Sequence, residues 1–147
     1  MLLSPDEQQR LRAKARKELK RLDTIFSDPT VLAEIEDFKN MFIKCECTYK
    51  IILAEHQFHK NKKKTEHLKI DMTQAPYALK FAGYTFDRSL LALLFGAETQ
   101  LGKRSVKKLR DSLTHKPTEK DLTELRNRKK ELYGCMNEFL RIIRTYK

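Results

Sequence analysis

An arginine and a histidine stand five positions apart in a segment whose residue types suit RNA cleavage without a metal ion. Arg110 is followed directly by Asp111, and His115 comes four residues later. Such cleavage needs a group that titrates near neutral pH to move the proton of the 2′-hydroxyl or of the leaving group. It also needs a cation to hold the charge that develops on the phosphoryl oxygens. Imidazole and guanidinium suit these roles, so we expect His115 to be the general acid or base, Arg110 the phosphate clamp and Asp111 the residue that orients one of them.

The same side chains also have a purely structural interpretation. In a chain this rich in arginine, an Arg and a His at such a spacing arise readily by chance. Arg110 then pairs with Asp111 or another nearby acid, and His115 only bonds to the free carbonyls at the end of a helix. The spacing alone leaves catalysis and structure as open alternatives.

Four basic residues precede the pair, namely Lys103, Arg104, Lys107 and Lys108. We expect a basic helix from about Lys103 to His115, because Pro117 disfavours helical conformation at the residue before it. On that helix the four side chains would guide an RNA backbone. The whole chain holds 31 Lys and Arg against 20 Asp and Glu, a net charge of +11 that favours a polyanionic partner, and nucleic acid first.

With its context, the motif resembles the signature of the HEPN superfamily (higher eukaryotes and prokaryotes nucleotide-binding). Members are small all-α domains, many of them metal-independent ribonucleases, whose signature is an Arg, usually a polar residue, and a His after four to six positions. Arg110, Asp111 and His115 match it position by position, and the resemblance covers Gly102 to about Tyr133 in detail. Pro117 stands where some subfamilies have a Tyr, which disfavours that subfamily and its nucleotide-transferase antitoxin pairing.

The resemblance implies an endoribonuclease that works as a homodimer, with two motifs facing each other across the interface and no cofactor. It further implies a toxin or phage-defence effector, with an antitoxin or another regulatory protein as a partner. On an ideal helix, residues five apart point about 140° apart, so a second copy would supply what one copy lacks. The basic helices would repel each other, so we expect the dimer to leave a groove there and to find its apolar contact along a helix from Val31 to His59.

Cysteine and histidine residues in the same long segment invite a zinc site, which helix geometry rejects. On a helix, Cys45 and Cys47 point about 200° apart, and Cys45 lies roughly 16 Å along the axis from His56. These residues cannot share one ion, so we expect no metal. The sequence leaves the roles of His56 and His59 unassigned, with packing or a place at the rim of the fold favoured.

The spacing of apolar residues predicts an all-α fold, a bundle of two or three long helices with shorter helices packed across them, in one domain over residues 1–147. Ser4 begins the first helix, in which a row from Leu11 to Phe26 is expected to be buried. A long helix follows from Val31 to about residue 60, and a polar connector from Lys60 to Lys64. Short helices are expected after Asp71 and Thr85, separated by Gly83, with a turn between Gly96 and Gly102. Thr118 begins a final long helix that reaches Tyr146.

Other features of the sequence concern location and further classes of function. The longest apolar stretch is far short of the ~20 residues that cross a membrane, no secretory signal is visible, and the three cysteines are expected to be reduced. We therefore expect a cytoplasmic protein without a membrane partner. Two alternatives to an enzyme stay open: a non-catalytic basic helical module that binds nucleic acid or a protein, and an antitoxin or adaptor that buries its apolar faces against another chain.

Overall fold

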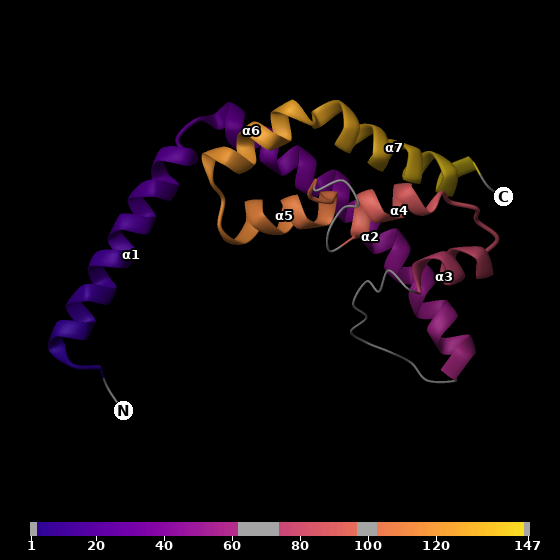
Figure 1. Cartoon of the computed structure of the whole chain (residues 1–147), viewed down its shortest axis with the longest axis horizontal. Coiled ribbons are helices and arrows are strands. Elements are labelled where there is room, and N and C mark those ends of the chain that lie inside the picture. The colour runs from indigo at the N-terminus through magenta and orange to yellow at the C-terminus, as the bar shows by residue number, and fades with distance from the viewer. Residues whose placement is uncertain (1–2, 62–73, 97–102, 146–147) are drawn as a thin grey trace.

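The computed structural model describes residues 3–61, 74–96 and 103–145, and these residues form seven helices and no strand (Figure 1). The helices are α1 (Pro5–Ile25), α2 (Pro29–Asn61), α3 (Ala75–Phe81), α4 (Arg88–Phe95), α5 (Val106–His115), α6 (Glu119–Asn127) and α7 (Lys129–Thr145). The predicted all-α fold is confirmed. The helix start predicted at Asp71, the turn at Gly102, most of the connector after Lys60 and the seam residue Tyr146 lie outside the described residues.

Helix α2 is the central element, and its apolar seam lies inside the fold. Ile35, Phe38, Phe42, Cys45, Tyr49 and Leu53 are buried along it. The ring of Phe95 in α4 lies 5.9 Å from that of Phe42 and 5.7 Å from that of Phe139 in α7, so α2, α4 and α7 share one aromatic core. The dimer contact predicted along this seam is wrong, because these side chains already fill the core of a single chain.

Helix α1 projects from the body of the molecule (Figure 1). Ser4 caps it as predicted, with the Ser4 hydroxyl accepting a hydrogen bond from the Glu7 amide at 3.3 Å. The predicted burial of its apolar row is wrong, because every residue from position 11 to 20 is exposed. Only the end of α1 is attached: Ile25 is buried, and the Arg21 guanidinium donates to the Pro117 carbonyl.

Two short helices flank a glycine turn, as predicted. Gly83 separates α3 from α4 and has a φ of +88°. Residues that carry a Cβ adopt this left-handed backbone conformation only at a cost in free energy. Helix α4 begins a little later than Thr85, because Asp87 is its cap and accepts a hydrogen bond from the Ser89 amide at 3.0 Å. Its buried residues Leu91, Leu94 and Phe95 then enter the core.

The final helix is divided at Arg128, which the sequence did not indicate. Thr118 caps α6 as predicted, but Arg128 ends that helix and α7 starts at the next residue. Neither Gly nor Pro stands at the break. The Arg128 guanidinium donates to the Arg104 carbonyl at 2.8 Å, so a contact with a residue 24 positions away holds the chain where a continuous helix was expected.

Candidate functional site

Helix α5 carries the candidate site and is fixed on its inner side. Val106, Leu109 and Leu113 are buried, and the buried Ser105 hydroxyl both accepts from the Lys108 amide at 3.1 Å and donates to the Gly96 carbonyl. This cap starts the helix three residues later than predicted. The predicted end is confirmed, because α5 stops at His115. The polar side of α5 therefore faces outward in a defined orientation.

Arg110 is held in place by three contacts. Its Nη2 lies 3.1 Å from Glu46 Oε2 on α2 and 3.1 Å from Asp111 Oδ1, and its guanidinium carbon lies 4.9 Å from the centre of the Phe42 ring. Its side chain is 21% exposed, and the buried Nε has no hydrogen-bond acceptor among the described residues. A buried donor without an acceptor is costly, so the hydrogen bonding of this guanidinium is incomplete at Nε, while the rest of the side chain is partly exposed.

Asp111 pairs with two cations of α5 and lies one turn before His115. On a helix, residues four apart lie in one row, and Lys107, Asp111 and His115 occupy such a row on α5. Lys107 Nζ lies 3.5 Å from Asp111 Oδ2, and the other oxygen of that carboxylate receives the tip of Arg110. The Arg110 guanidinium thus reaches Asp111, and His115 is the next residue of that row, one turn further along α5. His115 is exposed as the last residue of α5.

A buried carboxylate holds the turn of residues 116–118 between α5 and α6, which we call the corner. Asp121 on α6 accepts hydrogen bonds from Arg104 Nη2 at 2.7 Å, from the Ser112 hydroxyl at 2.9 Å and from the Thr118 amide at 3.0 Å. Burial raises the pKa of Asp121, but these hydrogen bonds and the Arg104 charge outweigh it and hold the pKa below its ordinary value. Sequence reasoning missed Asp121 as a site residue. The available signal was its position three residues after Thr118, the spacing of a capping box.

The four predicted RNA contacts lie in different surroundings. Lys107 pairs with Asp111, which also binds Arg110, so Lys107 belongs to the same charged group. Lys108 is exposed on α5, but residues two apart on a helix do not face each other, so it does not lie beside Arg110. Lys103 is exposed and lies 3.7 Å from Glu131 on α7. Arg104 is committed to the fold, because its guanidinium binds both Asp121 and Glu124. The structure therefore joins Lys107 to the candidate site through Asp111 and leaves Lys108 exposed on the same helix, whereas Arg104 binds two carboxylates of α6.

The two histidines of α2 pack against one aromatic ring. The centre of the Phe81 ring on α3 lies 5.3 Å from that of His56 and 5.4 Å from that of His59. Within the described ranges, the structure contains no group of three or more His, Cys, Asp or Glu side chains arranged to hold a metal. These histidines thus join the end of α2 to α3.

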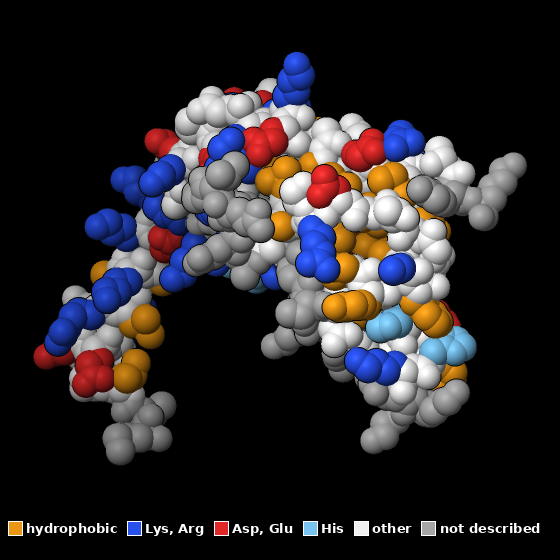
Figure 2. Space-filling view, turned by 45° about the vertical axis from the view of Figure 1, so that its right-hand side comes forward, with side chains coloured by type: hydrophobic (Ala, Val, Ile, Leu, Met, Phe, Trp, Pro, Cys, Tyr) orange, Lys and Arg blue, Asp and Glu red, His pale blue; other side chains and the backbone are white. Residues whose placement is uncertain are grey.

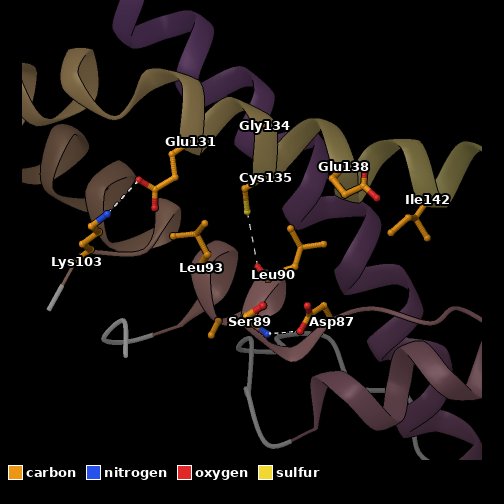
Figure 3. Close-up of a pocket in the computed structure, with 11 residues that line it drawn as sticks. Asp87, Ser89, Leu90, Leu93, Lys103, Glu131, Gly134, Cys135, Glu138 and Ile142 are labelled. Atoms are coloured by element: carbon orange, nitrogen blue, oxygen red, sulfur yellow. Dashed lines mark hydrogen bonds and ion pairs between the residues drawn. The ribbon is translucent and has the colours of Figure 1, made fainter. Parts of the chain in front are cut away.

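A separate hollow of about 620 Å³ lies between α4 and α7 (Figure 3). Leu90, Leu93 and Ile142 form much of its apolar lining, and Gly134 lies on its α7 side. Carboxylates stand around it, namely Asp87, Glu131 and Glu138. None of Arg110, Asp111 and His115 lines this hollow, so it is a second feature with its own chemistry.

Comparison with known proteins gives no relative: no family model, curated protein or solved structure matches the chain. Among the helices that the structure describes, none combines the length and the apolar character needed to cross a bilayer. The function proposed below therefore rests on the chain's own residues and on the motif from Arg110 to His115.

Proposed function

We propose that the chain is a metal-independent endoribonuclease of the HEPN type, with Arg110 as phosphate clamp and His115 as general acid or base. One arrangement carries this proposal: Glu46 and Asp111 fix the Arg110 guanidinium, whose Nε has no acceptor among the described residues, on the helix that ends at the exposed His115. An Arg that served only to pair with an acid would need neither the exposed imidazole nor the lysines of the same helix.

Each group has a defined part in the cleavage. The neutral His115 imidazole takes the proton of a 2′-hydroxyl, and the resulting alkoxide oxygen attacks the adjacent phosphorus. The bond from phosphorus to the 5′-oxygen breaks, and that oxygen takes up a proton from an imidazolium, which leaves a 2′,3′-cyclic phosphate and a 5′-hydroxyl end. Arg110 holds the added negative charge on the phosphoryl oxygens. Asp111 positions the guanidinium, and Lys107 and Lys108 attract the flanking backbone.

The two proton transfers call for two imidazoles or for one that acts twice. In a homodimer, the second His115 supplies the second group, so the active form proposed here pairs two α5 helices around one RNA strand. Such an enzyme would act in the cytoplasm as a toxin or phage-defence effector, with an antitoxin or regulatory protein as its partner. Its expression without that partner would arrest growth.

Incubation of the purified protein with total RNA in EDTA tests the proposal. We expect the wild type to produce fragments with 5′-hydroxyl ends, and His115→Ala to lower the rate at least about a hundredfold, within the range that general acid–base catalysis contributes. His59→Ala is the matched control, because His59 is also an exposed histidine but packs against Phe81. No cleavage by the wild type, or equal cleavage by His115→Ala, contradicts the catalytic role.

A second candidate is a non-catalytic basic helical module, an antitoxin or adaptor, that binds nucleic acid or a partner protein. The observation that favours it is that Arg110 already has two carboxylate partners, which compensate its charge. In that case Arg110→Ala weakens RNA binding only slightly and mainly changes its dependence on salt. Under the ribonuclease proposal, the same substitution abolishes cleavage while helicity is kept.

A further inference from the structure

Helix α1 presents an apolar row that nothing in the described fold covers. Leu11 and Leu19 are 57% and 59% exposed, and Ala15 lies between them in the same row. Figure 2 shows Lys and Arg side chains along one side of this helix and hydrophobic ones along the other. The helix is therefore amphipathic although it projects away from the core.

The sequence nonetheless specifies α1 as a helix from its first residue. Ser4 caps it, Pro5 occupies the first turn, and Asp6 and Glu7 lie where acidic side chains favour the helix N-terminus. Single helices of this length are marginal in water, because most helical stability in proteins comes from packing of an apolar face. A stable α1 thus calls for a surface that covers the row from Leu11 to Leu22.

The hollow between α4 and α7 has the length and polarity to be that surface. The residues of α7 that line the hollow run from Glu131 to Ile142, which are eleven positions apart. Leu11 and Leu22 on α1 are also eleven positions apart, so both rows are about 17 Å long. Its floor is apolar and its edge carries carboxylates, as Figure 3 shows for Glu131 and Glu138. Lys103 also lines the hollow and lies 3.7 Å from Glu131, so its lining holds three carboxylates and one lysine. Helix α1 carries seven basic and four acidic residues, so the apolar row and the net charge of the helix complement those of the hollow.

Gly134 gives an independent indication that a helix lies against this face of α7. Glycine in the interior of a helix costs roughly 0.5–1 kcal/mol relative to alanine. Apart from its chain neighbours and the backbone of its own helix, no described residue lies within 4 Å of a Cβ placed on Gly134, so no contact seen within residues 3–61, 74–96 and 103–145 requires glycine there. A missing side chain lets another backbone approach closely, which a helix docked in the hollow would do.

We propose that α1 of one copy lies in the hollow between α4 and α7 of a second copy, so that two chains exchange their first helices. The helix in the hollow cannot come from the same chain, because α1 projects away from α4 and α7 in Figure 1 and Arg21 ties its base to Pro117. The narrow row, with the small Ala15 between leucines, suits a helix contact better than a bilayer surface, and Glu18 and Asp23 weaken attraction to anionic lipid.

This exchange supplies the apolar dimer contact that the α2 seam does not offer. It leaves the outer side of α5 free, so Lys107, Lys108 and Arg110 stay accessible. Helix α1 is also connected to the candidate site, because Arg21 donates to the carbonyl of Pro117, which is two residues after His115. The assembly itself does not depend on RNA cleavage, and its test measures association alone.

Sedimentation at low micromolar concentration provides the first test. We expect the wild type to sediment near twice 17.4 kDa and Leu11→Glu/Leu19→Glu to sediment as a monomer. The matched control is Gln9→Glu/Ala13→Glu, which adds the same charge on exposed positions of α1 outside the row and should stay dimeric. Circular dichroism of each variant shows that the helical body is kept.

The acceptor is tested separately. Gly134→Trp fills the open space on the hollow side and should dissociate the dimer, whereas Asn137→Trp, at an exposed position of α7 outside the hollow, should not. Chains carrying Leu19→Cys and differently tagged chains carrying Gly134→Cys, both with Cys47→Ser, should form a disulfide between chains under mild oxidation.

A monomeric wild type, or a dimer that survives Leu11→Glu/Leu19→Glu, overturns the exchange. Dissociation by the leucine changes but not by Gly134→Trp overturns the hollow as the acceptor. Wild-type protein that sediments with anionic vesicles and is monomeric without them shows a membrane as the partner of α1 instead. A dimer that fits all expectations but cuts no RNA supports the exchange and contradicts only the ribonuclease.

Discussion

The Arg104 guanidinium donates to Asp121 Oδ1 at 2.7 Å, and this ion pair joins the start of α5 to the helix that follows its end. The Asp121 side chain is only 5% exposed. Because Ser112 and Thr118 bind the other oxygen of the same carboxylate, one buried group fixes both sides of the chain segment that contains His115. The position of the candidate acid or base thus depends on a residue that never meets the substrate.

Asp121→Asn should lower the free energy of unfolding by about 2–3 kcal/mol, because the amide keeps the volume but has one acceptor oxygen instead of two. It therefore loses either the bond from Arg104 Nη2 or the bonds from Ser112 and Thr118. Urea denaturation followed by circular dichroism measures this. Asp23→Asn, at an exposed acid on α1, is the matched control and should change stability by less than about 0.5 kcal/mol. Equal stability of the two variants contradicts a structural role for the corner.

The same carboxylate should make stability depend on pH in a defined direction. Since the pKa of Asp121 is lower in the folded chain than in the unfolded one, its stabilising contribution is complete above the unfolded value of about 3.9. That contribution is lost as the pH falls through the lower pKa that Asp121 has in the folded chain. The difference in stability between wild type and Asp121→Asn should stay constant from about pH 7 to pH 5 and shrink below about pH 4. A difference that grows on acidification contradicts this assignment.

The parts of the fold that local sequence determines were predicted well. The run from Val31 to about residue 60 has no Gly or Pro and a regular apolar seam, and α2 follows it from Pro29 to Asn61. The caps at Ser4 and Thr118 are local motifs and were also found. The break at Arg128 was not predictable, because it depends on a bond to the Arg104 carbonyl across the fold.

The exposure of the apolar row of α1 was not predictable for a different reason. Periodicity shows that a helix has an apolar face, but it does not show whether the cover comes from the same chain. For the candidate site, the pattern placed Arg110, Asp111 and His115 on one helix and ended that helix correctly at His115. It did not reveal Glu46, which stands 64 positions from Arg110, because such a pairing exists only after folding.

Glu46 provides a direct test of whether Arg110 serves an anion or the fold. Glu46→Gln keeps an oxygen that accepts from Arg110 Nη2 but removes a charge that competes with phosphate. If Arg110 is the phosphate clamp, RNA binding by Glu46→Gln should tighten several-fold in a filter-binding titration. Asp37→Asn on the same helix, which pairs with Tyr133 instead, is the control and should leave the affinity unchanged. Weaker binding by Glu46→Gln contradicts the clamp.

The three thiols should differ sharply in reactivity. Burial raises the pKa of Cys45 and of Cys135 to about 12, so both stay protonated and shielded at about pH 8, whereas Cys47 is exposed. An aromatic disulfide reagent should therefore titrate one thiol per folded chain and all three in denaturant. The Cys47→Ser chain should show no fast thiol. A second fast-reacting thiol in the folded wild type contradicts this burial.

Glycine substitutions at two positions should change stability in opposite directions. Gly134 lies within α7 with open space where a Cβ would be, so Gly134→Ala should raise the stability of the single chain by about 0.5–1 kcal/mol. Gly83 has a positive φ, so Gly83→Ala should lower it by about 1–2 kcal/mol although there is equally open space around it. Urea denaturation in the Leu11→Glu/Leu19→Glu background separates these effects from association.

In the otherwise wild-type chain, Gly134→Ala should weaken the dimer, because its methyl group keeps the partner's α1 at a distance. A Gly134→Ala chain that is less stable as a monomer would show that α7 needs glycine for its own fold, and the space beside it would then no longer indicate a docked helix.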